Sequence, residues 1–353
     1  MPSTLASIAE LNCPLPYPAE NAVLLGHGSG GKLSAELLND VFLPALSNPA
    51  LARLDDQAVV NVNQQRIAFT TDSFVVKPLF FPGGNIGSLA VHGTINDLAV
   101  GGATPLFLSA AFIVEEGYPI EDLRRIVLSM HEAAAAAGVQ VVTGDTKVVE
   151  RGKGDGVFIT TTGIGIMPEG VEMCSDRARP GDKILLSGSI GDHGIAILAK
   201  REGIEFESAV ESDSAALHTL TAAIVSCGSG VRCMRDPTRG GLSSALNEIA
   251  TRSGVSMEID ERAIPVCEEV SGACELLGLD PLYVANEGKL IAIVEAESAD
   301  KVLEAMRKHP LGAQAVVIGT VNSGSPSLVT MRTTLGTTRI VDMLSGDQLP
   351  RIC

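Results

Sequence analysis

Apolar segments of this 353-residue chain alternate between the two-residue period of a strand and the 3.6-residue period of a helix, in two successive series. The first series consists of expected strands at 58–63, 66–71, 106–114, 139–143 and 157–166, with expected helices at 33–42, 86–100 and 120–137. The second consists of expected strands at 183–187, 231–235, 255–260, 289–294 and 315–321, with expected helices at 194–202, 214–226, 241–252 and 298–308. The pattern predicts two mixed α/β domains with a cleft between them.

A turn at Arg179-Pro180-Gly181-Asp182 separates the two series and marks the predicted domain boundary. At roughly 150 residues per domain, a chain of this length is expected to form two domains. The predicted organisation is an N-terminal extension at 1–20, a first domain at 21–178, a second domain at 179–344 and a mobile tail at 345–353.

Charge and composition exclude several classes of function. The 26 basic and 42 acidic residues give a net charge of −16, whereas a general nucleic-acid binder needs patches of Lys and Arg. Acidic membranes are unsuitable partners for the same reason, and no apolar run approaches the roughly 20 residues of a membrane span. The first residues lack the basic charge of a signal peptide, and the seven scattered cysteines indicate reduced thiols. These features predict a cytoplasmic protein.

A glycine-rich loop, Gly26-His27-Gly28-Ser29-Gly30-Gly31-Lys32, precedes the first expected helix. Backbone amides in such a loop can approach an anion closely, and the N-terminus of the helix adds partial positive charge, so phosphate is the natural ligand. The spacing matches neither the P-loop nor the dinucleotide-binding motif. A surface loop without a ligand therefore stays open as an equal alternative.

Carboxylates stand at the ends of several apolar runs. A single aspartate in such a place is usually a turn or cap residue. Several gathered at one site would repel one another unless a hard cation neutralised them, and Mg²⁺, which binds a few carboxylates together with substrate phosphates, fits best. We therefore hypothesise that these acids bind Mg-ATP and that the glycine-rich loop covers its phosphates. The acids are Asp55, Asp56, Asp72, Asp97, Asp145 and Asp236.

Three further glycine-containing turns lie in the second half, at 187–194, 234–241 and 286–289. The turn at 234–241 suits an anion as well as a plain helix start. In the turn at 187–194, His193 is interpreted as a solvated or capping histidine rather than a catalytic one. The turn at 286–289, which contains Glu287, is by itself an ordinary turn.

The chain ends on a thiol, Cys353. Chain ends are usually mobile, so this cysteine is expected to be exposed and able to travel. It is either an incidental terminal residue or, beside a nucleotide site, a covalent carrier that uses the nucleophilicity of a thiolate.

In this order the segments resemble the ATP-dependent synthetase superfamily that includes aminoimidazole ribonucleotide synthetase, selenophosphate synthetase and thiamine-monophosphate kinase. Within it, the chain resembles the HypE family of hydrogenase maturation proteins from about Leu24 to Cys353. The terminal Pro350-Arg351-Ile352-Cys353 is the specific part, because the other relatives lack a terminal carrier cysteine. Selenophosphate synthetase is further disfavoured by His27 and Ser29 in the glycine-rich loop, where it would have Cys or selenocysteine and Lys. The other segments that carry the resemblance are 26–31, 72–76, 96–102, 144–149 and 236–241.

The resemblance implies a PurM-like fold whose first domain binds ATP and forms a homodimer through its sheet. It implies that the carbamoyltransferase HypF loads a carbamoyl group onto Cys353 and that ATP-dependent dehydration converts this thiocarboxamide into a thiocyanate. The cyanide would pass to the HypC–HypD complex for the iron of a [NiFe] hydrogenase.

The resemblance also implies roles for individual residues. Glu287 would take the nitrogen proton and Lys147 would orient the thiocarboxamide oxygen, unless either forms a structural ion pair or contacts the nucleotide. The implied nucleotide ligands are Gly28, Ser29, Gly30, Gly31, Asp55, Asp72, Asn96, Asp97, Asp145, Thr146, Thr238 and Arg239. The implied metal ligands are Asp55, Asp56, Asp72, Asp97 and Asp236.

Two other classes of function stay open. A small-molecule ATP-dependent kinase or synthetase of the same fold would act without the tail. A non-catalytic carrier that only displays Cys353 would not hydrolyse ATP.

Overall fold

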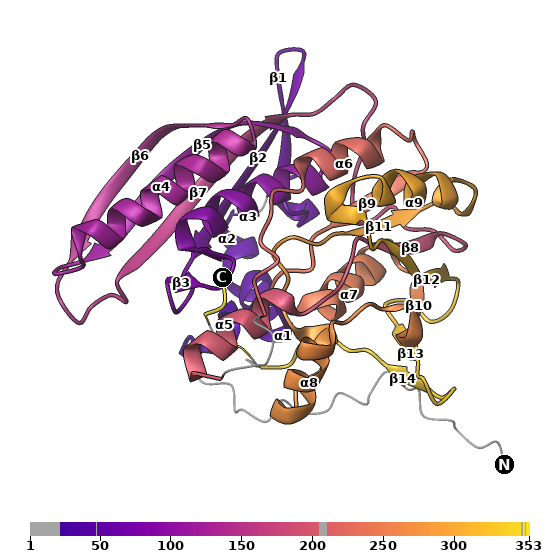
Figure 1. The fold of residues 1–353 in the computed structure, drawn as a ribbon. Coiled ribbons are helices and arrows are strands. Elements are labelled where there is room, and N and C mark those ends of the chain that lie inside the picture. The colour runs from indigo at the N-terminus through magenta and orange to yellow at the C-terminus, as the bar shows by residue number, and fades with distance from the viewer. Residues whose placement is uncertain (1–21, 47, 205–209, 347–348, 350) are drawn as a thin grey trace.

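Two separate sheets organise the chain, one from each series of elements (Figure 1). The computed structural model describes residues 22–46, 48–204, 210–346, 349 and 351–353, so the predicted extension at 1–20 lies outside the described residues. Every strand and helix predicted in the second series is present to within a few residues. The mixed α/β class predicted from the alternation is confirmed.

The first sheet has the strand order β1-β2-β7-β5-β6. Only β5 and β6 are parallel, and the other neighbours run antiparallel. Its strands are β1 (Ala58–Val62), β2 (Gln65–Phe74), β5 (Thr104–Glu115), β6 (Gln140–Val149) and β7 (Val157–Ile166). A two-stranded ribbon of β3 (Phe80–Phe81) and β4 (Gly84–Asn85) leads into the next helix.

Helix α3 (Ile86–Val100) lies between the first sheet and the second half of the chain. It begins at Asn85, whose side chain accepts a hydrogen bond from the Gly87 amide at 2.8 Å and so caps the helix. Twelve of its 15 residues are buried. A helix that is apolar on all sides is covered on all sides, and small residues allow the close approach. A Cβ on Gly93, for example, would lie 2.9 Å from the Phe74 ring.

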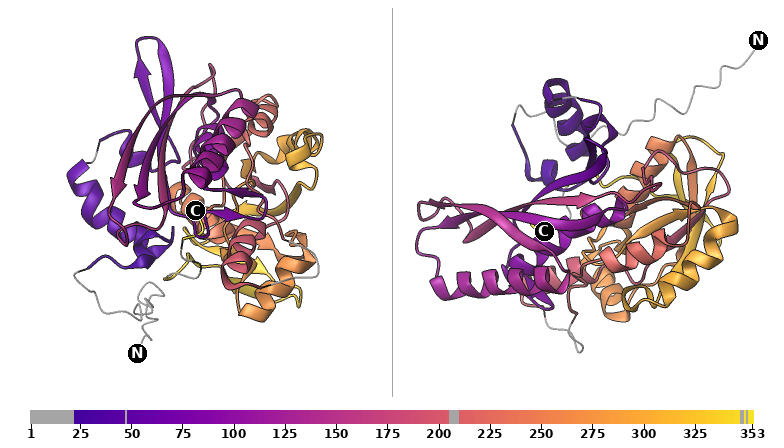
Figure 2. Two further views of the ribbon diagram at one scale, coloured as in Figure 1. Left: turned by 60° about the vertical axis from the view of Figure 1, so that its left-hand side comes forward. Right: turned by 90° about the horizontal axis from the view of Figure 1, so that it is seen from above.

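Helix α4 (Ile120–Ala136) covers the same sheet with one apolar face. Its buried residues, Ile126, Met130, Ala133 and Ala134, recur at helical spacing. The predicted stop is confirmed, because Gly138 follows with a φ of +70°. The outer parts of α4, β5, β6 and β7 project away from the second half of the chain (Figures 1 and 2).

The second sheet has the order β14-β13-β10-β12-β8-β11-β9 and carries helices on both faces. Its strands are β8 (Lys183–Leu186), β9 (Val231–Arg235), β10 (Ser256–Asp260), β11 (Ile291–Val294), β12 (Val316–Asn322), β13 (Val329–Arg332) and β14 (Thr338–Ile340). The central strands β8 and β11 are buried on both sides, as continuous apolar runs require. Ile184 packs with α7 on one face, while Leu185 packs with α6 and α9 on the other.

The helices of the second half are α5 (Asp192–Glu202), α6 (His218–Val225), α7 (Gly241–Ser253), α8 (Glu268–Leu277) and α9 (Ala299–Arg307). Short 3₁₀ turns lie at Leu25–Gly28, Leu51–Arg53, Glu261–Ala263, Pro281–Tyr283, Ala296–Ser298 and Pro310–Gly312. None of the helices within the described residues combines the length and apolar character that a membrane span needs.

The helix predicted at 33–42 differs from the expectation. It consists of α1 (Lys32–Leu37), one π-helical turn at Leu38–Phe42 and α2 (Leu43–Leu46). None of these residues is buried, so the predicted apolar face does not pack into a core. The segment stands beside the first sheet rather than on it (Figure 2).

Because α3 is enclosed, truncation of its core residue Ile95 should be costly. Ile95→Ala should lower the free energy of unfolding by about 2–5 kcal/mol, since the cavity cannot collapse. The control Leu128→Ala, at a residue of α4 that is 56% exposed, should change it by less than about 0.5 kcal/mol. Urea unfolding followed by circular dichroism measures both, and equal losses would contradict the central position of α3.

Candidate active site

Three aspartates from three elements meet where the two halves of the chain adjoin. Asp56 precedes β1, Asp97 lies in the last turn of α3, and Asp236 directly follows β9. One carboxylate oxygen from each lies within 4.8 Å of the others. A set of hard oxygen donors at this spacing suits Mg²⁺. The predicted gathering of these three acids is therefore observed.

Burial and mutual repulsion make this acid cluster reluctant to ionise. Burial raises the pKa of Asp56 to about 6 and, together with the charge of Asp56, raises the pKa of Asp236 to about 8. Burial and the neighbouring carboxylates hold the pKa of Asp97 well above its ordinary value. Arg235 offsets part of this repulsion by an ion pair of 3.0 Å with Asp56. A bound divalent cation would replace the protons that the cluster otherwise holds.

The two remaining predicted metal ligands, Asp72 and Asp55, lie in different surroundings. Asp72 lies inside β2, not after it as predicted, and burial raises the pKa of its carboxyl group beside Asp97. The Asp55 carboxylate is turned elsewhere. It accepts hydrogen bonds from the amide and hydroxyl of Ser175, at 3.0 and 2.8 Å, and pairs with Arg53 at 3.2 Å. Asp72 therefore adjoins the acid cluster, whereas Asp55 does not join it.

The C-terminal residues dock between the two halves of the chain (Figures 1 and 2). The terminal carboxylate of Cys353 accepts a hydrogen bond from the Val75 amide at 3.1 Å, and the carbonyl of Arg351 accepts one from the Lys77 amide at 3.0 Å. The side chains of Ile352 and Cys353 belong to the core around α3. The expectation of an exposed terminal thiol is therefore wrong in this conformation, because backbone hydrogen bonds hold the tail and only 8% of Cys353 is exposed.

The Cys353 thiol lies in a strongly polarised environment. Burial is the largest cause that raises the pKa of Cys353 to about 12; Glu287 and Asp72 add to the rise, while Arg239 opposes it. The docked thiol is consequently neutral and a weak nucleophile.

Glu287 lies beside this thiol and is almost completely buried, with 2% of its surface exposed. Burial, with smaller contributions from Asp236, Asp213 and Asp72, holds the pKa of Glu287 well above its ordinary value. Its Oε1 atom has no hydrogen-bond partner among the described residues. A buried polar oxygen without a partner is costly, so this atom is available to a ligand or a reacting group.

The glycine-rich loop packs against the turn that follows β9. The Arg239 guanidinium donates to the Gly28 carbonyl at 2.8 Å, and a Cβ on Gly30, which has a φ of +73°, would lie 2.7 Å from the Arg239 carbonyl. A cavity of about 170 Å³ joins Gly28, Ser29 and Arg239 to Cys353. The loop therefore faces the tail, as a phosphate cover would.

The N-terminus of the following helix is less open than predicted. The Lys32 amide, the first of α1, donates to the Leu344 carbonyl at 2.9 Å. The helix has only six residues. Its partial positive charge is already satisfied in part by the chain itself.

Asp145, Thr146 and Lys147 are not brought to the acid cluster. They were predicted to follow a strand that ends at residue 143, but β6 continues to Val149 and all three lie inside it. They are exposed on the free edge of the sheet, where Lys147 pairs with Asp145 at 2.7 Å. Backbone pairing with β5 continues through all three residues, so these polar side chains do not end the strand.

The Asn96 side chain hydrogen-bonds to backbone groups of the second half of the chain. Its side chain donates to the carbonyls of Ala215 and Glu287, at 3.0 and 3.1 Å, and accepts from the Leu217 amide at 2.8 Å. The predicted nucleotide ligand is thus a clamp between α3 and the turn of Glu287. Thr238, by contrast, stands half-exposed in the same turn as Arg239.

Two residues of the second half take roles that the sequence did not indicate. His193 is fully buried instead of solvated, and it contacts the tail. Asp213 hydrogen-bonds the Glu287 amide at 3.0 Å. No local pattern marks Asp213, because its partners are distant in the sequence.

Comparison with known proteins places these features in a family. Models of the AIR synthase related protein match residues 54–167 with their N-terminal domain and residues 179–330 with their C-terminal domain. Carbamoyl dehydratase HypE of Azotobacter vinelandii is 60% identical over 332 residues, which are 94% of this chain and 97% of that protein. The chain belongs to the HypE family.

Two solved HypE structures share the arrangement of this chain. A HypE–HypF complex superposes with a TM-score of 0.83 at 49% identity and covers 87% of this chain and 99% of that one. HypE in complex with ATP superposes with a TM-score of 0.80 at 49% identity and covers 94% and 100%. The two mixed α/β domains implied by the resemblance are thereby confirmed, while the exact boundaries proposed for the domains and the tail stay predictions.

The acid cluster predicts a specific pH dependence of stability. Because Asp56 and Asp236 have pKa values of about 6 and about 8 in the folded chain, the folded state holds more protons than the unfolded state above about pH 4. Stability in EDTA should therefore fall as pH rises toward 8, with a loss in melting temperature of at least about 3 °C between pH 5.5 and 8.

Addition of 5 mM Mg²⁺ at about pH 8 should restore the melting temperature, since the cation replaces the lost protons. The variant Asp236→Asn should show a flatter pH dependence and a weaker response to Mg²⁺. Differential scanning fluorimetry measures the melting temperature of the wild type and of the variant at both pH values in EDTA and at about pH 8 with Mg²⁺. Stability that is constant or rises over this range in EDTA would contradict the electrostatics of the cluster.

Proposed function

We propose that this chain is an ATP-dependent carbamoyl dehydratase that acts on its own C-terminal cysteine. It converts an S-carboxamide on Cys353 to an S-cyanate and supplies cyanide ligands for the iron of [NiFe] hydrogenase. The observation that carries the proposal is the terminal thiol docked beside Glu287 and near Asp72, which in turn adjoins the acid cluster. Identities of 60% and 46% to carbamoyl dehydratases over nearly the full length favour this function over a small-molecule kinase or synthetase of the same superfamily.

The reaction needs a leaving group, because the oxygen of an amide does not depart by itself. Transfer of the γ-phosphoryl group of ATP to this oxygen converts it into phosphate and releases ADP. The first N–H proton leaves as the O-phosphorylated imidate forms. Loss of phosphate and of the second N–H proton then leaves the nitrile carbon on sulfur. This is mainly a task of positioning and charge stabilisation, for which Arg239 and the glycine-rich loop adjoin the thiol.

The residues present fit a magnesium ion. Asp56, Asp97 and Asp236 would hold it, with Asp72 beside them. Bound Mg²⁺ would offset the charge of the transferring phosphoryl group. Asp55 is assigned no direct role at the metal, because its carboxylate is satisfied by Ser175.

Glu287 is the proposed base. Its buried carboxyl group holds a proton strongly, and its free Oε1 atom faces no competing donor among the described residues. A cation at the aspartates would relieve the repulsion from Asp236 and Asp72 and so favour ionised Glu287 before the reaction. Burial would still leave a basic carboxylate beside the cargo.

The environment of the thiol separates loading from dehydration. A carbamoyl group can be accepted only by a reactive thiolate, whereas the docked thiol of Cys353 has a pKa of about 12. We infer that the tail leaves the site to be loaded by HypF, consistent with the similar HypE–HypF complex, and returns with a neutral cargo. Transfer of cyanide to HypC–HypD and a cytoplasmic location belong to the same proposal.

The free edge of β6 supports a homodimer. Val142 and Val148 are 58% and 67% exposed, and a groove of about 1250 Å³ runs between α4 and β6. An exposed apolar edge strand requires a partner or a protective device. We propose that a second copy covers it. The assigned role of Lys147 then depends on this assembly, because within one chain Lys147 pairs with Asp145.

Mass spectrometry of the intact protein tests the reaction. After incubation with the carbamoyltransferase and its donor, Cys353 should gain the mass of one carbamoyl group, and Mg-ATP should then remove one water. Cys353→Ala should gain nothing. Glu287→Gln should be loaded but lose water at least about 100-fold more slowly, because it lacks the base. ATP turnover on a small metabolite with an unmodified tail would identify a synthetase instead.

Charge on the free edge should dissociate the dimer. The double variant Val142→Asp/Val148→Asp should sediment as a monomer, because unpaired charges would be buried at the proposed interface. The control Leu276→Asp, at a residue on α8 that is 76% exposed, should leave the dimer intact. Sedimentation equilibrium measures both, and a monomeric wild type would refute the assembly.

A further inference from the structure

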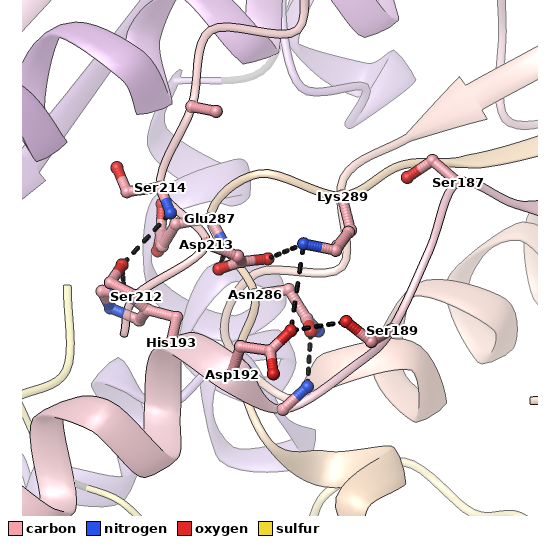
Figure 3. A network of polar contacts seen from close by, with 12 residues as sticks. Ser187, Ser189, Asp192, His193, Ser212, Asp213, Ser214, Asn286, Glu287 and Lys289 are labelled. Carbon is pink, nitrogen blue, oxygen red and sulfur yellow. Dashed lines mark hydrogen bonds and ion pairs between the residues drawn. The ribbon is translucent and has the colours of Figure 1, made fainter. Parts of the chain in front are cut away.

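One short segment of the second half contacts both Glu287 and His193, the residue that holds Ile352 of the tail. This segment, Ser212-Asp213-Ser214, lies between the start of α5 and the turn of Glu287 (Figure 3). Each of its three side chains makes a hydrogen bond to a different part of the site. We refer to it as the positioning segment.

The first contact leads to the tail. His193, the second residue of α5, has no exposed surface and uses both ring nitrogens. Its Nε2 atom lies 2.7 Å from the Ile352 carbonyl oxygen and its Nδ1 atom lies 2.7 Å from the Ser212 hydroxyl. A carbonyl can only accept, so Nε2 carries the proton and Nδ1 accepts from Ser212. The hydroxyl thereby sets the tautomer that holds the tail.

The contact with His193 sits next to the reactive residue. Arg351 and Cys353 are held by the backbone amides of Lys77 and Val75, which belong to the first half of the chain. Ile352, between them, is held by His193 from the second half. Both halves of the chain therefore hold the tail, and the contact with His193 is at the residue that precedes Cys353.

The second contact leads to the base. The Asp213 carboxylate accepts from the Glu287 amide at 3.0 Å and from the Lys289 ammonium group at 2.9 Å (Figure 3). Its side chain is only 4% exposed, and Lys289 also lies 4.0 Å from Asp192, the neighbour of His193. The buried pair links the turn of Glu287 to the start of α5.

The third contact leads to the helix that carries Asp97. The Ser214 hydroxyl lies 2.9 Å from Nδ1 of His92 on α3. Asn96 on the same helix holds the Glu287 carbonyl at 3.1 Å. The backbone of Glu287 is thus held at its amide by Asp213 and at its carbonyl by α3.

We propose that His193 and Asp213 are positioning residues for the reaction, joined by the positioning segment so that the tail and Glu287 are registered against each other. His193 sets the place of the Cys353 cargo, and Asp213 sets the place of the base. This inference rests on the proposed function. Neither residue touches the reacting atoms. Loss of either would misplace the cargo or the base, and such reactions slow strongly when the reacting groups are misplaced.

Two substitutions at His193 test the contact with the tail. His193→Phe keeps a ring in the cavity but removes the donor to Ile352, whereas His193→Gln retains an amide donor. With Phe, alkylation of Cys353 by iodoacetamide should be about tenfold faster, because a docked tail protects the thiol. Single-turnover dehydration of the loaded tail with Mg-ATP should be at least about tenfold slower. His193→Gln should recover most of both, and the Kd for Mg-ATP should be unchanged.

Two substitutions at Asp213 test the contact with the base. Asp213→Ala removes the acceptor for the Glu287 amide, and Asp213→Asn retains one. Dehydration should fall at least about tenfold with Ala and be partly recovered with Asn, while the alkylation rate of Cys353 stays within about twofold of wild type. Melting temperatures identify any variant that does not fold, and such a variant is replaced by Ser212→Ala, which should shift both rates in the direction of His193→Phe.

The outcomes separate the two proposals. Folded His193→Phe with wild-type alkylation and dehydration rates would overturn the inference, as would equal losses in Phe and Gln. Alkylation that responds to His193 while the wild type never dehydrates its cargo would retain the contact with the tail and refute the proposed function. A loss of Mg-ATP affinity in parallel with the rate would show a general structural role and overturn the inference.

Discussion

Electrostatic repulsion among buried carboxyl groups is the constraint on which the site depends. Asp56, Asp97 and Asp236 are brought together at the junction of the two halves, and Glu287 lies close enough to add to their repulsion. Such a cluster is stable only if its members hold protons, contact Arg235 or bind a cation. The same repulsion that weakens the empty site creates its affinity for a divalent cation. Burial, with a smaller contribution from this repulsion, raises the pKa of Glu287, and a carboxyl group that resists ionisation binds a returning proton well.

Helix α3 transmits this constraint to the rest of the fold. It carries Asp97 in its last turn and presents Asn96 to the turn of Glu287 and His92 to the positioning segment. Most other residues of this enclosed helix are small or apolar, and twelve of its 15 residues are buried. Residues of both domains therefore form the site, and α3 contacts the parts that come from each.

The docked tail shows how one thiol can take part in both loading and dehydration, although the two steps need opposite environments. Loading needs a thiolate, whereas dehydration needs a neutral cargo held still beside a base. The buried site disfavours the thiolate form of the Cys353 side chain and offers hydrogen bonds to the carbonyls of Arg351 and Ile352 and to the terminal carboxylate of Cys353. Backbone contacts of this kind do not depend on the state of the sulfur. They can hold the tail with or without its cargo.

Much of this protein was determined by the sequence itself. Strand and helix periodicities predicted most of the elements, since burial of one face imposes a period, but they did not predict α8 and the short strands β3, β4, β13 and β14. The order of the glycine-rich loop, the aspartates and the terminal cysteine was sufficient to indicate the family. The periodicity failed where burial is absent, at the exposed helix after Lys32 and along the edge strand β6, which carries Asp145 and Lys147. Only the tertiary structure decided that Asp55 turns toward Ser175, that Asn96 is a clamp and that His193 and Asp213 hold the tail and the base. These side chains contact partners from 74 to 191 residues away, and such contacts leave no local pattern in a chain.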